Sequence, residues 1–186
     1  MEMATKLWGV TATSLFKVGD QIRVGKYTAT CQKVLVSPTN GSVSGYVFWL
    51  DQYLDRQYTY VDAVERMPQD CMRDGNFKEL VDFMPLDIYL PSTEDIYGKD
   101  DFYRDGYKYE DGEQWELMKV NRNRLPDQVL DLDTKYLGCW LYNEAMISGS
   151  HAVISYAGDP SFAGDKTLLP VRPAMILSLG EEARHE

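Results

Sequence analysis

The side chains that most often carry out catalysis are scarce in this sequence. Its two histidines are His151 and His185. We expect His185 to lie in a frayed tail, so a hydrolytic unit would have to use His151. Ser148 and Ser150 are close to His151, but the GxSxG pattern that presents a nucleophilic serine on a sharp turn is absent. P-loop, dinucleotide-binding and HExxH patterns are absent too. These observations predict a protein without enzymatic activity.

Metal and cofactor sites are not indicated either. The three cysteines, Cys31, Cys71 and Cys139, are widely spaced, and no CxxC pair or Cys/His cluster indicates structural zinc. We interpret them as reduced thiols that are mostly buried; whether the fold brings two of them together stays open. The stretch Gly98–Glu113 contains several aspartates, but their spacing does not match an EF-hand calcium loop. We therefore expect no metal ion and no cofactor.

The composition favours recognition of another molecule. Acidic residues outnumber basic ones by 29 to 19, which gives a formal net charge of −10 and disfavours direct binding to nucleic acid or to an anionic membrane. Thirteen Tyr and four Trp supply large contact areas with few rotatable bonds to immobilise. The expected partner is a protein or a cell-surface ligand, with a basic host protein as the alternative partner of an acidic surface. The oligomeric state stays open.

The length of 186 residues fits one domain. Within it, residues 1–14 are expected to form a lead-in segment and residues 98–113 an exposed acidic loop. The N-terminal residues lack the apolar run of a secretion signal, and no stretch has membrane-spanning length. We therefore expect the protein in the cytoplasm of a host cell or in a virus particle.

The first third of the chain is expected to form an antiparallel meander. Residues Phe16–Val24 alternate around a Gly-Asp turn, and Tyr27–Ser37 is rich in β-branched residues, which favour strands. Pro38–Gly41 contains the turn signal Asn-Gly, and Tyr46–Leu50 is a short apolar run typical of a buried strand. Asp51–Glu65 mixes aromatic and charged residues and fits either a short helix or a strand.

Two short helices are expected after the meander. Residues Met72–Met84 place apolar side chains on one helical face, with Asn76 as the N-cap. Asp87–Leu90 then has the pattern of a strand. A second helix is expected to begin at Ser92, because Asp95 completes a capping box with it.

The closing region, residues 138–179, has the pattern of short strands separated by turns. Its apolar runs are Cys139–Leu141, Ala152–Tyr156 and Val171–Leu177, and Gly, Ser, Asn, Asp and Pro fill the segments between them. Loops at the ends of such strands are where binding residues concentrate. Arg172 lies in an apolar context, so its guanidinium must find acceptors. We expect Arg172 to bind loop carbonyls or a carboxylate rather than a ligand.

This region resembles a domain family of gut Firmicutes and their phages, whose members carry a WWLRSP block followed by a GVRPAL block. Gly138–Leu141 stands in place of the first block and Pro170–Leu177 in place of the second. Upstream, Phe16–Gly25, Met72–Phe83 and Ile88–Tyr103 resemble three further blocks in the same order. The second Trp and the Arg-Ser-Pro of the first block are missing here, so the chain resembles a divergent member.

The resemblance implies an α+β, C-type-lectin-like fold related to the formylglycine-generating enzymes, with short twisted antiparallel sheets, two short helices and long irregular loops. It also implies a non-enzymatic binding module of phage or gut-bacterial origin. The alternatives are an acidic, anti-CRISPR-like inhibitor of a host nucleic-acid-binding defence protein and a structural virion subunit. Trp140, Arg172 and Pro173 are expected to be structural. The expected ligand-binding residues are Tyr142, Asn143, Ser148, Ser150, His151, Tyr156, Asp159, Ser161, Phe162 and Asp165.

Overall fold

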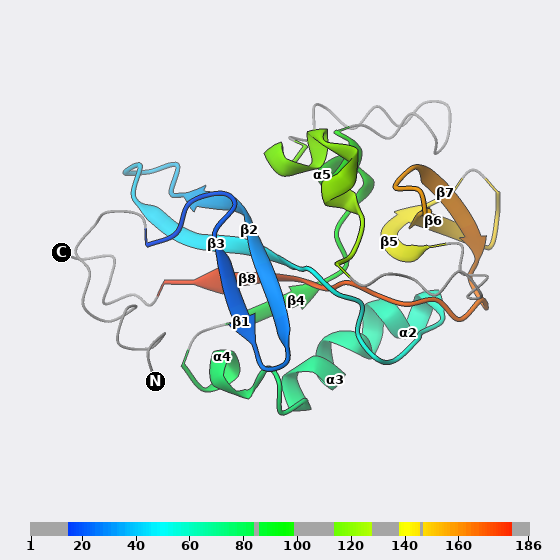
Figure 1. The fold of residues 1–186 in the computed structure, drawn as a ribbon, viewed down its shortest axis with the longest axis horizontal. Coiled ribbons are helices and arrows are strands. Elements are labelled where there is room, and N and C mark those ends of the chain that lie inside the picture. Colours follow the sequence, from blue (N-terminus) through cyan, green and yellow to red (C-terminus); the bar gives the residue numbers. More distant parts are fainter. Residues whose placement is uncertain (1–14, 84–85, 99–113, 128–137, 146, 180–186) are drawn as a thin grey trace.

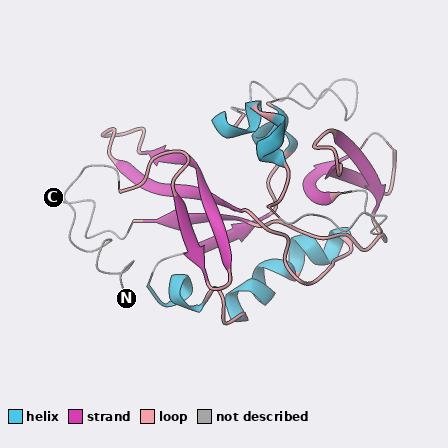
Figure 2. Cartoon of the chain, in the orientation of Figure 1, coloured by secondary structure: helices cyan, strands magenta, loops and turns pink. Residues whose placement is uncertain are grey.

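The computed structural model describes residues 15–83, 86–98, 114–127, 138–145 and 147–179. These residues form a mixed α+β structure with eight strands in two antiparallel sheets and several short helices (Figure 1). The larger sheet and the smaller sheet lie at opposite ends of the view, and helices flank both (Figure 2). The expected exposed acidic loop and the lead-in segment fall outside the described residues, apart from Gly98.

The larger sheet has five strands in the order β1-β2-β3-β8-β4. Its strands are β1 (Gln21–Val24), β2 (Tyr27–Val36), β3 (Val43–Leu50), β4 (Leu86–Tyr89) and β8 (Ala174–Ser178). Strands β1, β2 and β3 form the expected meander, with every neighbouring pair antiparallel. Strand β8 comes from the far end of the described chain and pairs with both β3 and β4. The pairing of β8 with β3 and β4 therefore joins parts of the sheet that are far apart in the sequence.

The smaller sheet contains three consecutive strands in the order β5-β6-β7. They are β5 (Cys139–Glu144), β6 (Ser150–Ile154) and β7 (Pro160–Gly164). The first two match the expected apolar runs. Strand β7 was not expected, because its sequence PSFAG has only one large apolar side chain and is flanked by turn residues.

Three helices follow one another on one side of the structure. They are α2 (Tyr60–Glu65), α3 (Met67–Arg73) and α4 (Lys78–Phe83). Figure 1 shows α3 and α4 beneath the larger sheet, while α2 extends toward β5 of the smaller sheet. Thr59 caps α2 by accepting the N–H of Asp62. The ambiguous segment Asp51–Glu65 thus ends in a helix, not a strand.

Three shorter elements lie on the other side. They are α5 (Thr93–Tyr97) and two 3₁₀ turns, η1 (Glu116–Lys119) and η2 (Asn121–Arg124). The capping box expected at the start of α5 is confirmed: Ser92 accepts the N–H of Asp95, and the Asp95 carboxylate accepts the N–H of Ser92.

The short helix expected within Met72–Met84, after Asn76, is present as α4, but the helix α3 before it was not expected. Helix α3 ends at Arg73, and a separate helix α4 begins only at Lys78. Asn76 does not cap α4. Its Oδ1 atom accepts the N–H of Lys26 in the β1–β2 turn, and its own N–H groups donate to Asp74. A tertiary contact thus overrides the local capping signal, and the described residues form four α-helices where two were expected.

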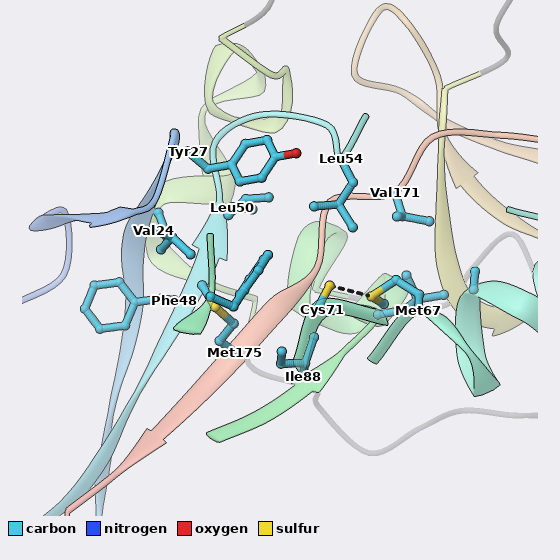
Figure 3. Packing of buried hydrophobic residues seen from close by; sticks show 14 of the residues in the cluster. Val24, Tyr27, Phe48, Leu50, Leu54, Met67, Cys71, Ile88, Val171 and Met175 are labelled. Atoms are coloured by element: carbon cyan, nitrogen blue, oxygen red, sulfur yellow. Dashed lines mark hydrogen bonds between the residues drawn. The ribbon is translucent and has the colours of Figure 1, made fainter. Parts of the chain in front are cut away.

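Side-chain alternation along the strands produces two separate hydrophobic cores. On β3, Phe48 faces the first core with the helices, whereas Trp49 faces the second core with η1. Strand β8 repeats the division, with Met175 in the first core and Ala174 in the second. Figure 3 shows part of the first core, including the contact between Cys71 and the Met67 sulfur. Each face of the central strands β3 and β8 is therefore covered by its own layer.

Candidate functional site

The smaller sheet, which carries most of the expected binding residues, is covered on both faces. Trp140 and Val153 pack in the first core, whereas Cys139 and Ile154 pack in the second. The side chains available to a partner are therefore those at the strand ends, in the turns and on the outer strand β7. The expected binding residues do not form one continuous face.

His151 and Asp165 do come together, on the side of the sheet that faces α2. The Nδ1 atom of His151 lies 2.5 Å from Oδ1 of Asp165, and because a carboxylate only accepts hydrogen bonds, we place the proton on Nδ1. The imidazole stacks on the ring of Tyr60, with centroids 3.3 Å apart and planes inclined by 13°. The side chain of His151 is 12% exposed. The ring is thus held between α2 and the turn after β7.

Tyr60 ties this arrangement to β5. Its hydroxyl donates a 2.7 Å hydrogen bond to the carbonyl oxygen of Tyr142. Burial raises the pKa of Tyr60 well above its ordinary value, so the hydroxyl keeps its proton and acts as a donor at any physiological pH. Ser150 is next to His151 on the strand and points to the opposite face, so it is not placed to serve as a nucleophile for this histidine.

Asn143 has a role within the fold. Its Oδ1 atom accepts the N–H of Thr93 at 2.8 Å, and its Nδ2 atom is 3.4 Å from Oε1 of Glu94. Asn143 therefore links β5 to the first turn of α5. Its polar groups are used inside the protein.

The other expected binding residues are divided between turns and strands. Ser148 and Asp159 are exposed, one in each turn beside β6, while Ser150 on β6 and Ser161 on β7 are half-buried. In the β6–β7 turn, the Ser155 hydroxyl accepts the N–H groups of Ala157 and Asp159. This turn therefore holds its shape through its own hydrogen bonds and presents Tyr156 on a defined backbone.

Exposed aromatic side chains occur in the described residues only on and beside the smaller sheet. Tyr142 is 56% exposed, Tyr156 is 70% exposed and Phe162 is 49% exposed. Ile147 and Leu168, in the adjoining turns, are also more than half exposed. Phe162 stands opposite the buried Ala152 on β6 and so projects from the margin of the second core. The sequence had singled out all three aromatic residues.

Trp140 and Arg172 are buried where the sheets meet. The Trp140 indole donates to the carbonyl of Tyr58 at 2.8 Å. The guanidinium of Arg172 stacks on the Trp49 ring, 3.6 Å from its centroid, and donates to the carbonyls of Leu50 (2.9 Å) and Arg124 (2.8 Å). The Trp49 indole in turn donates to the Arg172 carbonyl at 2.8 Å. Burial lowers the pKa of Arg172. Pro173, the next residue, is also buried.

The sequence did not indicate a polar cavity that lies beside Arg172. Its volume is about 270 Å³. The floor is the face of the larger sheet beyond the second core, and η1, η2 and the residues after them form the roof. Lining side chains from the sheet are Gln21, Thr30, Gln32, Trp49 and Asp51, and those from the roof include Met118, Arg122, Asn123 and Asp127.

A period-two polar stripe was the available signal for this cavity. Thr28, Thr30 and Gln32 alternate with Ala29 and Cys31, which are buried in the first core. Such alternation indicates a strand with one polar face. From the sequence, this segment was expected only to form a strand.

The three cysteines are buried free thiols, as expected. Burial raises the pKa of Cys31 and of Cys139 to about 11, and that of Cys71 to about 12. Thiols with such pKa values are protonated and unreactive at neutral pH.

No group of three potential metal-binding side chains is found within the described residues. Among the same residues, no helix has the length and apolar character needed to cross a bilayer. Comparison of the chain with protein-family models, with curated proteins and with solved structures finds no match in any of the three. The function is therefore inferred from the chain's own residues.

Proposed function

We propose that this chain is a non-enzymatic binding module that recognises a protein or cell-surface ligand through the margin of the smaller sheet. The observation that carries the proposal is the position of Tyr142, Tyr156 and Phe162. Among the described residues, they are the three aromatic side chains classed as exposed. Covering a large aromatic side chain with a partner removes apolar surface from water, which favours binding. Such side chains are enriched at the centres of interfaces.

The scaffold beneath these residues fits such a role. Both faces of the smaller sheet pack against cores, and internal hydrogen bonds of Asn143, Ser155 and Tyr60 fix the segments that present the aromatic rings. A rigid scaffold lowers the entropy lost when the surface binds. Polar loop residues around the rings supply adaptable hydrogen bonding, as in antibody paratopes.

The fold that we propose is C-type-lectin-like, and the family is the gut-Firmicutes and phage family that the sequence resembles. Two residues of the matching blocks, Trp140 and Arg172, are both buried at the junction between the sheets, which is consistent with scaffold positions. By this proposal the protein acts in a host cell or on a virus particle, and it needs neither a cofactor nor a metal ion.

A cell-binding measurement tests the proposal. Fluorescently labelled protein is added to intact gut Firmicutes cells and to their separated surface-protein and cell-wall glycan fractions. The combined variant Tyr142→Ala, Tyr156→Ala and Phe162→Ala is expected to bind at least about tenfold more weakly than wild type. All three side chains are substantially exposed, so the variant is expected to stay folded.

The matched control changes three exposed apolar residues elsewhere. Val18→Ala, Val36→Ala and Met72→Ala remove exposed apolar side chains from the turn before β1, from β2 and from α3. This control is expected to bind like wild type. Equal binding by both variants would place the recognition surface elsewhere. If the protein ignores cells and instead binds a basic DNA-binding protein with steep salt dependence, the inhibitor alternative is favoured.

A further inference from the structure

We propose that the cavity beside Arg172 binds a small organic acid that carries a hydrogen-bond donor in addition to its carboxylate, such as a hydroxy acid or an amino acid. The site is separate from the aromatic margin of the smaller sheet. It lies on the larger sheet, beneath η1 and η2. The proposal therefore does not depend on the proposed function.

The cavity has the size for a ligand of this class. Its volume is about 270 Å³, which is enough for several water molecules. That is near the lower end of the range for small-molecule sites. Acids of about six to ten non-hydrogen atoms match this size.

The Arg172 guanidinium offers a buried donor. Two of its three nitrogens, Nε and Nη1, donate to main-chain carbonyls, and the Trp49 ring holds its plane in place. Within the described residues, Nη2 makes no hydrogen bond and Arg172 forms no ion pair with a carboxylate. Arg172 is only 3% exposed. Its positive charge is therefore buried, and it has no directly paired anion among the described residues. A ligand carboxylate would supply one.

A second guanidinium lies at the rim. Arg122 on η2 lines the same cavity, is exposed and has no ion pair within the described part of the chain. Two arginines on one cavity favour a carboxylate, because guanidinium groups bind its oxygens in a planar, directional way. Asp51 is held by hydrogen bonds from Thr28, Thr30 and Gln21. Within the described residues it forms no ion pair with either arginine, so both guanidinium groups keep donors for a ligand.

Gln32 provides the reason for the additional donor. It is the extra residue of a β-bulge, between Cys31 and Lys33, which pair with consecutive residues of β3. Bulges often redirect a side chain next to a functional site. Gln32 is 4% exposed and lines the cavity, and its Oε1 atom has no hydrogen-bond partner within the described residues. An unpaired buried acceptor is costly, and a hydroxyl or ammonium group on the ligand would satisfy it.

Asp127 at the rim fits the same chemistry. Its carboxylate lines the cavity, is exposed and has a single long contact, 3.5 Å, to the amide nitrogen of Gln52. The four charged lining residues, Arg122, Arg172, Asp51 and Asp127, carry no net charge together. This balance suits a small acid whose hydroxyl or ammonium group faces the carboxylate side better than a highly charged anion such as phosphate.

Isothermal titration calorimetry with four small probes tests the proposal. The probes are D-glycerate and L-serine, which carry both groups, propionate, which lacks the donor, and glycerol, which lacks the carboxylate. Glycerate or serine is expected to bind with a dissociation constant below about 1 mM, and propionate and glycerol at least about tenfold more weakly. The proposal would be overturned if glycerol binds as tightly as the better acid, or if none of the four probes binds.

Two variants and a control assign the contacts. Arg122→Gln is expected to weaken binding of the better acid at least about tenfold, while Arg73→Gln, an exposed arginine on α3 that is not part of the cavity, should leave it unchanged. Gln32→Leu is expected to abolish the preference for that acid over propionate. Urea unfolding of each variant verifies that it is folded. Unchanged binding by a folded Arg122→Gln variant would contradict the proposed carboxylate site.

Discussion

Among the described residues, the flat polar groups of Arg172 and His151 lie closest to aromatic rings, and their surroundings differ. Arg172 lies on Trp49 with 3.6 Å between the guanidinium carbon and the ring centroid, and His151 lies on Tyr60 with 3.3 Å between ring centroids. The Arg172 stack is buried and joins β3 to the segment before β8. The His151 stack is partly exposed and joins α2 to β6. Both connect parts of the chain that are distant in sequence.

Arg172 and His151 differ in the groups that accept their hydrogen bonds. Arg172 donates to main-chain carbonyls, so these hydrogen bonds do not need a particular neighbouring side chain as acceptor. His151 depends on one other side chain, Asp165. Residues that look suited to bind a ligand can thus be internal connections, as Asn143 and His151 are, while exposed aromatic rings remain available for a partner.

Removing the Arg172 guanidinium is expected to have the largest effect. Arg172→Met keeps much of the side-chain volume but leaves the carbonyls of Leu50 and Arg124 without these donors. Each orphaned buried acceptor costs about 1–3 kcal/mol, partly offset because the buried charge is gone. The free energy of unfolding in urea should fall by about 3 kcal/mol.

Arg122→Gln is the control for that measurement, because the exposed side chain of Arg122 has no hydrogen bond or ion pair within the described residues. Its free energy of unfolding should stay within about 0.5 kcal/mol of wild type. If Arg172→Met is as stable as wild type, the burial of the charge costs as much as its hydrogen bonds contribute, and the proposed difference between the two stacks is lost.

Cys139 provides a smaller, pH-dependent test near Arg172. Burial raises the pKa of its thiol from the ordinary 9.0 to about 11, and the positive charge of Arg172 opposes that rise. Below pH 9 the thiol is protonated in both the folded and unfolded states. Between pH 9 and 11 the unfolded chain releases this proton and the folded chain keeps it, so stability falls as pH rises.

Cys139→Ala removes this contribution. Wild type should lose about 1 kcal/mol more than the variant when the free energy of unfolding is compared at pH 8 and pH 10. Each protein's free energy of unfolding is compared with its own value at the other pH. A loss of stability that the substitution causes equally at both pH values therefore cancels. Parallel pH profiles for the two proteins would show that the Cys139 thiol does not have the raised pKa.

The smallest expected effect concerns the second stack. His151→Phe keeps a ring against Tyr60 but removes the hydrogen bond to Asp165. Because both side chains are partly exposed, we expect a loss of about 0.5–1 kcal/mol in the free energy of unfolding. Asp165→Asn, which retains an acceptor, should cost less. A loss near 3 kcal/mol in His151→Phe would make the two stacks equivalent.

Local signals predicted much of the fold. The β-branched content of Tyr27–Ser37 and the short apolar runs Tyr46–Leu50 and Ala152–Tyr156 identified β2, β3 and β6. The Ser92–Asp95 spacing identified the start of α5. The local signals failed where a contact distant in sequence determines the structure. Asn76 is of a type that often caps helices, but its side chain instead accepts the N–H of Lys26 in the β1–β2 turn. Strand β7 is stabilised by its pairing with β6, and its own residues carry little strand preference.

The candidate sites were predicted unevenly for the same reason. Tyr142, Tyr156 and Phe162 could be singled out because residue type and loop context suffice to propose an exposed aromatic residue. The internal role of Asn143 depends on Thr93, which is far away in sequence. The cavity requires strands β1 to β3 and the η1–η2 segment to meet, and the long-range packing that brings them together is not encoded in any one segment.

The position of β8 also constrains how the protein is made. Strand β8 lies between β3 and β4, and it is the strand with which β4 pairs. On the ribosome, the N-terminal meander can pair as soon as it emerges, but β4 must wait until almost the whole described chain has been synthesised. Such long-range pairing is slow and leaves strand edges exposed. Late synthesis is therefore the stage at which this nascent chain is most in need of protection by chaperones.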